Sequence, residues 1–379
     1  MSKAVSFHLG LNAIDPAHYG DPGVLRGCEN DARDMAAIAK AAGYTPTVLL
    51  TRKATSMALF ATLDQHAKAL QSGDAFLLSM SSHGAQVRDL TGEEADGKDE
   101  TWCLYDRMVL DDEIYAAMCK FREGVNIVVL SDSCHSGTMT RRLRLLTEAN
   151  IADDFLPNSG AMLTRCFDPI LASQCWETHQ SLYAAVKYAA GSRTLQDAAA
   201  AVLLISGCQD EQLSGDLPTN GVFTGALKTV WANGGYRGDY ADFTRKIINA
   251  IGSPLQVPNL TVYGRNGDVL KAQRPFQTAV AVGNGASHSR DDAVDRIAGD
   301  IFRFELEIPR RALNGASPED IQRCIEDLCT PVLTETWTQL LQLGQAPARV
   351  RGSRGEWSVG CSGSSGGGVS CGGSISGSW

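Results

Sequence analysis

VNIVVLSDSCHSG, residues 125–137, holds the pattern that decides the fold and the chemistry of this chain. Its apolar run, VNIVVL, is rich in β-branched residues and stops at a polar Ser-Asp-Ser-Cys segment. Short apolar runs of this kind are typical of strands buried on both faces of a parallel sheet. Cys134 therefore follows the carboxyl end of a strand, where the loops of an open α/β sheet usually build the functional site. We expect its sulfur to meet a substrate there.

A second strand ends in a histidine. The stretch GDAFLLSMSSHG, residues 73–84, repeats the pattern and leaves His83 at a corresponding edge. The thiolate is the nucleophilic form of cysteine, so an imidazole that takes the thiol proton would complete a catalytic pair. We expect the backbone N–H groups of Gly84 and Cys134 to bind the oxyanion of acyl transfer. His135 adjoins the nucleophile, but neighbours on an extended segment point to opposite faces, so we expect a structural role for it.

Further strands alternate with segments of helical period, which indicates a sheet built from βα units. Six strands are expected, at Val5–Leu11, Thr47–Thr51, Ala75–Met80, Asn126–Ser131, Ala201–Ser206 and Gln256–Val262. Helical periodicity covers 31–42, 56–71, 110–121, 223–231 and 240–251. The predicted fold class is α/β, with a mostly parallel six-stranded sheet sandwiched by helices. Insertions at 84–105 and from 138 to about 195 follow the two strands that lead to His83 and Cys134. We expect both insertions to be binding loops.

Three parts are expected along the chain. The α/β pattern fills residues 1–264, a C-terminal extension of unassigned role follows at 265–348, and the Gly- and Ser-rich stretch 349–379 reads as a flexible tail. The chain has 379 residues, 44% of them hydrophobic, which is typical of a folded globular protein.

Composition and charge indicate which classes of partner and which cellular compartment to expect. A net charge of −9 offers no broad basic surface for a phosphate backbone, so we expect no nucleic-acid partner and better complementarity to a cationic substrate. No signal peptide or membrane-spanning run is recognised, and we expect no membrane partner. The eleven cysteines form no CxxC pairs, which favours reduced thiols and a cytoplasmic location.

Five motifs, in order, resemble those of the metacaspases and bacterial caspase-like peptidases: LRGCENDA, SHG, DGKDET, DSCHSG and ISGCQDEQLSGD. They lie within residues 3–264, and His83 lies 51 positions before Cys134, close to the spacing typical of caspases. The resemblance implies a caspase-hemoglobinase fold and peptide-bond hydrolysis by Cys134 and His83. It also implies cleavage after Arg or Lys, and by analogy a monomer.

The resemblance further implies a pocket for the residue before the cut, lined by Asp132, Asp31, Cys28 and Ser81. A cationic side chain needs a carboxylate in a partly dry pocket, which agrees with two aspartates there. Asp31 has a simpler interpretation as a first-turn helix charge, and Asp210 is either an additional negative charge or a solvated loop residue.

Calcium and self-cleavage are left open by the sequence. Asp96, Asp99, Asp111 and Asp112 form an acidic group of the kind that hard cations bind, and many metacaspases resemble it there. Arg141, however, stands near the position of a further family aspartate, so a solvated acidic loop is an equal alternative. No other cofactor is expected.

Arg141, Arg142 and Arg144 lie in a segment that we expect to be accessible. Either the chain cuts itself there, or these residues are ordinary surface arginines.

The sequence thus predicts a cysteine endopeptidase that acts on proteins or peptides with Arg, and also Lys, before the cut. A transpeptidase or ligase would use the same residues but let an amine outcompete water. A catalytically silent caspase-like scaffold is the alternative from another class, and the pairing of Cys134 with His83 argues against it.

Overall fold

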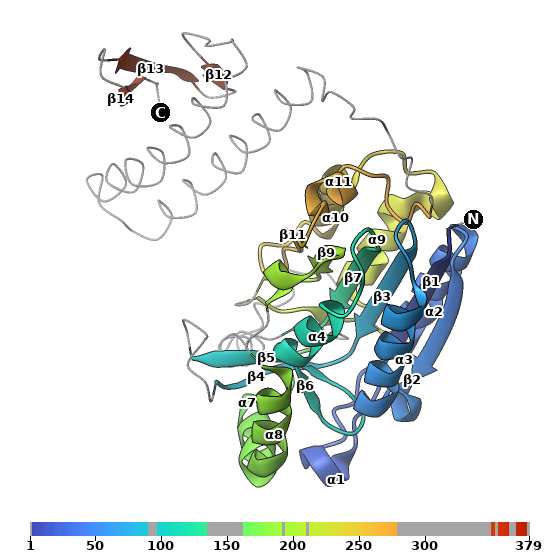
Figure 1. Cartoon of the computed structure of the whole chain (residues 1–379). Helices are drawn as coiled ribbons and strands as arrows, with labels where there is room; N and C mark the ends of the chain where they lie inside the picture. Colours follow the sequence, from blue (N-terminus) through green and yellow to red (C-terminus); the bar gives the residue numbers. More distant parts are fainter. Residues whose placement is uncertain are drawn as a thin grey trace. The chain divides into compact units, whose positions relative to one another are not determined.

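Six apolar strands form one sheet in the computed structural model of the chain (Figure 1). The structure describes residues 2–89, 97–134, 162–191, 194–209, 212–278, 350–352, 355–363 and 369–376. It divides the chain into two units, Met1–Ala281 and Val282–Trp379, each considered by itself.

The sheet has the strand order β11-β9-β7-β3-β1-β2. Neighbouring strands are parallel, except that β11 is antiparallel to β9. The bounds are β1 Ala4–Gly10, β2 Thr45–Leu50, β3 Ala75–Ser81, β7 Asn126–Asp132, β9 Ala201–Ser206 and β11 Asn259–Tyr263. The predicted six-stranded, mostly parallel sheet is therefore confirmed.

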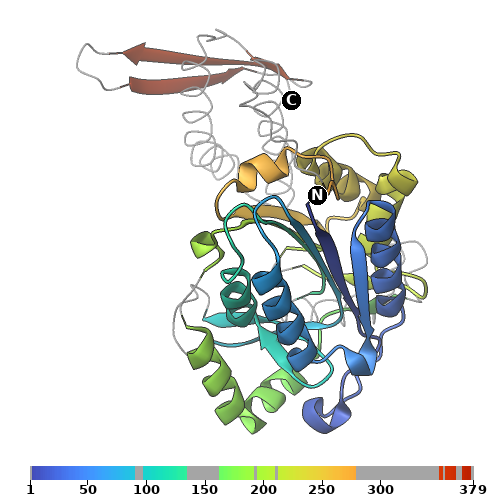
Figure 2. The same ribbon diagram turned by 45° about the vertical axis from the view of Figure 1, so that its right-hand side comes forward.

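Helices cover both faces of the sheet, as Figure 2 shows from a second side. Alternate side chains of a strand point to opposite faces, so Leu78 packs with α3 (Ser56–Ala69) and α4 (Asp111–Met118). Its neighbour Leu77 packs with α2 (Cys28–Ala41), α9 (Val222–Trp231) and α10 (Tyr240–Ile251). Continuous apolar strands are required because both faces are covered.

One close approach fixes the N-terminus of α2 over the carboxyl edge of the sheet. Gly10 ends β1, and a Cβ at this position would lie 2.2 Å from the carbonyl oxygen of Cys28. Glycine therefore lets the first turn of α2 reach the edge where Gly10 is in register with Ser81, which in turn is in register with Asp132. Three consecutive strand ends and one helix start meet at this edge.

The two insertions contain regular structure that the sequence analysis did not assign. The first forms an antiparallel sheet of β4 (Gly84–Arg88), β5 (Lys98–Cys103) and β6 (Met108–Leu110). In the second, α7 (Pro169–Thr178) and α8 (Gln180–Ala190) follow β8 (Leu163–Thr164), which pairs antiparallel with β10 (Gly215–Asp216). A start signal for α7 was present, since Asp168 accepts the N–H of Ile170 and proline stands at the first position.

Short elements complete the first unit: helices α1 (Pro16–Tyr19) and α11 (Gly267–Lys271), and 3-10 turns η1 (Thr51–Lys53), η3 (Leu195–Asp197) and η4 (Ala232–Gly234). The unit extends beyond residue 264 because Leu270 and Phe276 pack into the core on the α9 and α10 face. In the second unit, β12 (Val350–Gly352), β13 (Gly355–Gly363) and β14 (Val369–Ser376) form an antiparallel sheet within the stretch expected to be a flexible tail.

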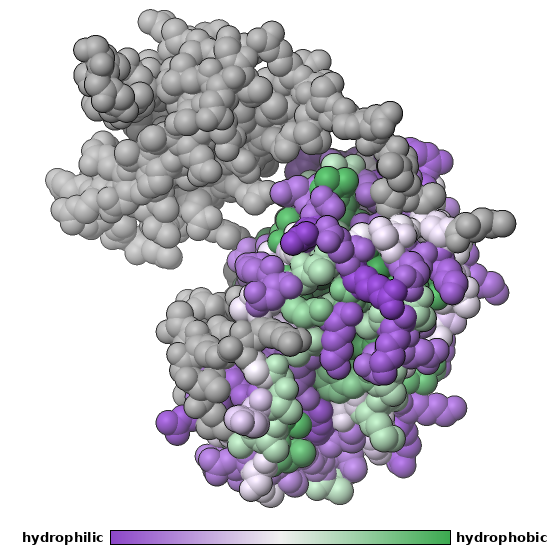
Figure 3. All heavy atoms as spheres, viewed as in Figure 1, coloured by the Kyte–Doolittle hydropathy of each residue, from purple (hydrophilic) through white to green (hydrophobic). Residues whose placement is uncertain are grey.

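Hydrophilic side chains predominate on the face of the described residues seen in Figure 3. Large apolar side chains that reach the surface, such as Met57 and Tyr188, belong to different elements. Isolated exposed apolar residues are usual on folded proteins. None of the helices in the described part of the chain is both long enough and apolar enough to cross a bilayer.

We predict an acid-sensitive core because His8 is buried in β1, where its ring nitrogens bond Ser79 and Ser6 at 2.8 and 2.9 Å. Burial lowers the pKa of His8 from 6.5 to about 3. Between pH 6.5 and about pH 3, His8 binds a proton in the unfolded chain but not in the folded chain. His8 therefore costs stability as pH falls below 6.5, by up to roughly 1.4 kcal/mol per pH unit.

The measurement is urea unfolding of Cys134→Ala and of Cys134→Ala with His8→Gln between pH 7 and pH 4. The other histidines are common to both variants. The difference in unfolding free energy that favours His8 over glutamine should therefore decrease as pH falls. A difference in unfolding free energy that stays constant with pH would contradict a buried neutral His8.

Candidate active site

The predicted catalytic residues follow two paired strand ends. Ser81 of β3 is in register with Asp132 of β7, and His83 and Cys134 each lie two positions further along. Parallel neighbours present positions of equal register on one face, so both residues are delivered to the same edge of the sheet. Both are buried, with 7% of His83 and 0% of Cys134 exposed.

His83 is held in the tautomer that a base requires. Its Nε2 lies 3.1 Å from the carbonyl oxygen of Gly23, and a carbonyl only accepts, so Nε2 carries the proton. Nδ1 keeps its lone pair, and this buried atom has no hydrogen-bond partner within the described residues. Burial lowers the pKa of His83 to about 4, although the carbonyls of Gly23 and Arg165 oppose the shift. The imidazole is therefore neutral near pH 7.

Cys134 is held as a thiol. Its Sγ donates to the carbonyl oxygen of Gln212 at 2.8 Å. The side chain packs in a small buried cluster with Cys166, Cys208 and Leu213. The donated bond means that the sulfur carries its proton in this arrangement, so a base must remove that proton before the sulfur can attack.

A buried arginine fills the pocket expected beside these residues. The guanidinium of Arg165 lies 2.6 Å from Asp31, 2.9 Å from Asp132 and 2.8 Å from Asp216. Its Nη1 also donates to Ser81 Oγ at 2.8 Å. Arg165 is 0% exposed, and its pKa is well above the usual value because the carboxylates outweigh the opposing effect of burial. We call Asp31, Ser81, Asp132 and Asp216 the acidic pocket.

Cys28, the remaining residue of the expected pocket, lies in its wall. Its Sγ is 3.9 Å from Asp216 Oδ1, and burial raises the pKa of this thiol. The structure therefore brings together the four expected residues and adds two that the sequence analysis did not assign, Asp216 and Arg165. A signal for Asp216 was present, since it is the last residue of the quoted motif ISGCQDEQLSGD.

The pocket carboxylates are oriented by their own scaffold. Asp132 accepts from Ser214 and Thr224 hydroxyls, both at 2.7 Å. Asp216 accepts the backbone N–H of Arg26 at 2.7 Å. Asp31 accepts from Asn220 Nδ2 at 2.9 Å, and burial raises the pKa of Asp31. These bonds orient the carboxylates of the acidic pocket in addition to their contacts with Arg165.

Two aspartates of the acidic group expected to attract calcium, Asp99 and Asp112, contact a lysine. Lys187 Nζ lies 2.7 Å from Asp99, 2.6 Å from Asp112 and 3.6 Å from Asp89. Asp111 has a carboxylate oxygen in the same group as Asp99 and Asp112. Burial raises the pKa of Asp99 to about 6, while the carboxylate contacts raise that of Lys187 against the effect of its burial. We call Asp89, Asp99, Asp112 and Lys187 the lysine cluster.

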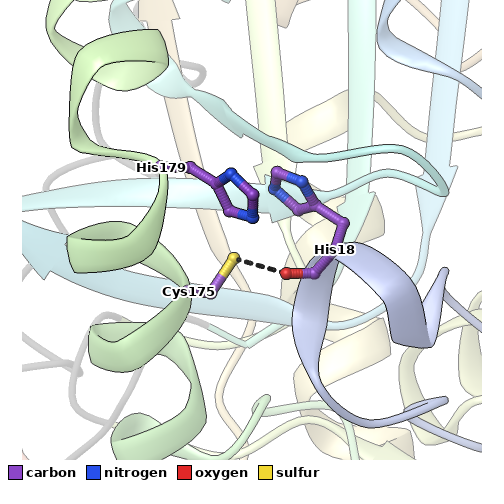
Figure 4. A group of neighbouring side chains, drawn as sticks. All are labelled: His18, Cys175 and His179. Carbon is purple, nitrogen blue, oxygen red and sulfur yellow. Dashed lines mark hydrogen bonds between the residues drawn. The ribbon is translucent and has the colours of Figure 1, made fainter.

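His18, Cys175 and His179 form a second group of possible metal ligands (Figure 4). The two imidazole rings stack at 4.1 Å with planes 12° apart, and Cys175 Sγ donates to the carbonyl of His18. Ligand lone pairs lie in the plane of each ring, so two stacked rings do not aim at a common point. His18 Nε2 instead bonds the Tyr183 hydroxyl at 2.8 Å, so the group is a packing contact of α1 with α7 and α8.

Several predicted residues lie outside the described residues: Asp96, His135, Arg141, Arg142, Arg144 and Asp210.

Comparison with known proteins agrees with this geometry. A family model described as the caspase domain matches residues 13–268. The chain belongs to this caspase family of cysteine peptidases. Residues 13–268 thus carry the caspase-like fold that the motifs implied, and they lie within the first unit, Met1–Ala281.

Fungal metacaspases are among its curated relatives. Metacaspase-1 of Mycosarcoma maydis is 28% identical over 278 residues, which are 66% of this chain and 66% of that protein. Metacaspase-1 of Saccharomyces cerevisiae is 29% identical over 247 residues, 58% of this chain and 56% of that protein. The chain thus spans less than two thirds of the length of these relatives. A crystal structure of a Geobacter sulfurreducens protein is 41% identical, with a TM-score of 0.65, covering 73% of this chain and all of that one.

The lysine cluster generates a stability prediction. Lys187→Met leaves three buried carboxylates without their cation, which should cost on the order of 3 kcal/mol. Lys228→Met is the matched control, because its bond to Asp34 is about one third exposed and should be worth less than about 1 kcal/mol. Denaturant unfolding in the Cys134→Ala background measures both, and equal losses in the two variants would show that Lys187 has no special role.

Proposed function

We propose that this chain is a cysteine endopeptidase that cleaves after arginine, with Cys134 as nucleophile and His83 as base. The observation that carries the proposal is the acidic pocket, which holds a complete guanidinium beside the two catalytic candidates. Three carboxylates in one dry pocket repel each other unless a cation joins them. An aspartate side chain before the cut would add a fourth negative charge.

Arginine matches the pocket better than lysine. Nη1 and Nη2 of a guanidinium point in different directions, and here Nη1 meets Asp132 and Ser81 while Nη2 meets Asp31 and Asp216. A lysine ammonium offers a single charged atom, which cannot occupy both positions. We therefore expect lysine to be a weaker substrate.

His83 Nδ1 takes the thiol proton of Cys134, and the thiolate attacks the carbonyl carbon of the substrate arginine. The N–H of Gly84 supports this assignment, because it already donates to the carbonyl oxygen of Arg165 at 2.9 Å. A second donor from the Cys134 backbone stays a prediction. His83 then protonates the leaving amine, and water hydrolyses the thioester with His83 again as base.

We further propose that calcium is not required, because Lys187 supplies the positive charge that a calcium ion would bring. Support comes from the short contacts of Lys187 Nζ with Asp99 and Asp112, two of the residues that the sequence analysis considered as calcium ligands. A divalent cation would have to displace a buried ammonium from its carboxylates. The cytoplasmic location, the monomeric state and self-cleavage at Arg141, Arg142 or Arg144 stay predictions.

Peptide hydrolysis tests the specificity. Fluorogenic peptides with Arg, Lys, Asp or Asn before the bond should be cut in the order Arg, then Lys, with Asp and Asn resistant, and Cys134→Ala should cut none. Product masses in the presence of an added amine would expose a transpeptidase, whose main product is an amide. A preference for Asp would refute the proposal.

Gly221→Ala tests the pocket itself. A Cβ there would lie 2.5 Å from Asp132 Oδ2 and 2.6 Å from Arg165 Cζ, in the place of the guanidinium. We expect kcat/KM for arginine peptides to fall at least roughly 30-fold, as for loss of a buried charge contact. Gly225→Ala in α9 is the control, because its nearest neighbour is 3.9 Å away. Equal activity of the two variants would place the substrate side chain elsewhere.

Calcium is tested on the same arginine peptide. Wild type should keep its rate in excess chelator, and millimolar calcium should not raise its melting temperature. Lys187→Met should be stabilised by calcium, because its carboxylates are left without a cation. Loss of wild-type activity in chelator, with recovery on adding calcium, would contradict the assignment of Lys187.

A further inference from the structure

Cys134 shares its small buried cluster with two other cysteines, Cys166 and Cys208, and with Leu213. Cys134 is 0% exposed, and the other two cysteines are each 4% exposed. The proposed hydrolysis uses only the sulfur of Cys134. A second thiol beside a nucleophilic thiol has a chemistry of its own, because a thiol that meets an oxidised sulfur forms a disulfide with it. The cluster therefore provides two possible disulfide partners for the nucleophile.

Cys208 is brought to the nucleophile by the neighbouring strand. β9 is parallel to β7, and the N–H of Gly207 donates to the carbonyl of Ser131 at 2.7 Å. One residue further, Cys208 Sγ donates at 3.6 Å to the carbonyl of Ser133, the residue that precedes Cys134. Neighbouring strands lie about 4.8 Å apart, and a disulfide joins Cα atoms up to roughly 7 Å apart. The two strand ends are thus spaced closely enough for a bond between Cys134 and Cys208.

The segment that carries Cys208 is itself fixed beside Cys134. Gln256 Nε2 donates to the carbonyl of Gly207 at 3.0 Å. A few residues later, the carbonyl of Gln212 accepts the thiol hydrogen of Cys134 at 2.8 Å. The chain after β9 therefore supports Cys208 and also holds the nucleophile in its thiol form.

Cys208 is a better partner for Cys134 than Cys166 is. Cys166 Sγ donates at 3.5 Å to the carbonyl of the residue that follows it, whereas Cys208 Sγ bonds the backbone next to Cys134. Burial raises the pKa of the Cys28 and Cys103 thiols, which lie outside the cluster. Neither of these two residues supplies a competing thiolate near neutral pH.

We propose that Cys134 and Cys208 are a redox pair, which forms a reversible disulfide when the protein meets a hydroperoxide. The disulfide switches the peptidase off. Formation of the bond does not depend on the proposed function, whereas the loss of peptidase activity rests on it.

The oxidation proceeds in two steps. His83 takes the thiol proton of Cys134, and the thiolate attacks one oxygen of the hydroperoxide. The O–O bond breaks, the other oxygen leaves with the proton from His83 as water or an alcohol, and Cys134 becomes a sulfenic acid. The Cys208 sulfur then attacks Cys134 Sγ, the S–O bond breaks, and water leaves with the Cys208 proton. A dithiol later supplies the two electrons that return both thiols.

The disulfide has two effects on the nucleophile. A sulfur bound in a disulfide cannot attack a carbonyl carbon, so hydrolysis stops. The same bond protects Cys134 from oxidation to sulfinic acid, which thiol reductants do not reverse. Hydrogen peroxide is smaller than the peptide group that must reach Cys134 in the proposed reaction. Any opening that admits a substrate therefore also admits the oxidant.

The experiment uses the full chain in four forms: wild type, Cys208→Ser, Cys166→Ser and Cys175→Ser. Cys175→Ser is the matched control, because Cys175 is as buried as Cys208 and lies outside the cluster. Each form is treated with hydrogen peroxide, alkylated and mapped by mass spectrometry without reduction. Wild type, Cys166→Ser and Cys175→Ser should contain a peptide pair linked through Cys134 and Cys208. Cys208→Ser should instead carry Cys134 as a sulfinic or sulfonic acid.

Hydrolysis of an arginine peptide is measured before peroxide, after peroxide, and after dithiothreitol. Wild type and Cys175→Ser should lose their activity in peroxide and regain most of it in dithiothreitol, whereas Cys208→Ser should not regain it. A wild-type map without the pair of Cys134 and Cys208, whatever the state of Cys134, would overturn the assignment of Cys208. Equal recovery of wild type and Cys208→Ser would overturn the switch.

Failure of the proposed function would give a different result. Absence of arginine-peptide hydrolysis in every untreated form would refute that function, while the peptide map would still decide the disulfide. The assignment of the bond does not depend on the folding of Cys208→Ser, because the wild-type map decides it.

Discussion

One guanidinium among three buried carboxylates is the interaction on which the rest of the site depends. Asp31, Asp132 and Asp216 come from α2, β7 and β10, and among the described residues Arg165 forms an ion pair with each of them. Carboxylates at such distances in a dry environment cannot all stay ionised without a cation. The acidic pocket therefore favours a positive charge, and hydrogen bonds to the two terminal nitrogens of Arg165 fix the orientation of its guanidinium.

Two glycines make this concentration of charge sterically possible. Gly10 lets the start of α2 approach the end of β1, which brings Asp31 within 2.8 Å of Ser81 Oγ. Gly221 leaves the space that the guanidinium takes, and its N–H donates to Asp31 at 3.1 Å. The backbone thus serves both as the wall of the pocket and as a source of donors for its carboxylates.

A second cation is paired with three buried carboxylates in the lysine cluster, where Lys187 lies among Asp89, Asp99 and Asp112. Both cations are contributed by residues 162–191, the part of the second insertion that the structure describes. This segment therefore links the acidic pocket to the sheet formed by β4, β5 and β6. Its cations differ in their surroundings, because Arg165 lies in an extended peptide across the catalytic candidates, whereas Lys187 lies within α8.

The sequence by itself determined the sheet, its helical layers and the edge at which chemistry is placed, because apolar periodicity and strand-terminal polar residues are local signals. It also pointed to Asp31, Ser81, Cys28 and Asp132 as neighbours, through a resemblance that the family model supports. Only the tertiary structure decided what fills the pocket. Arg165 meets Asp31 across 134 positions and Lys187 meets Asp99 across 88, and no local periodicity encodes pairings at that separation. The missing information was how the second insertion folds back, which is set by the pairing of β8 with β10 and by the requirement of buried carboxylates for a cation.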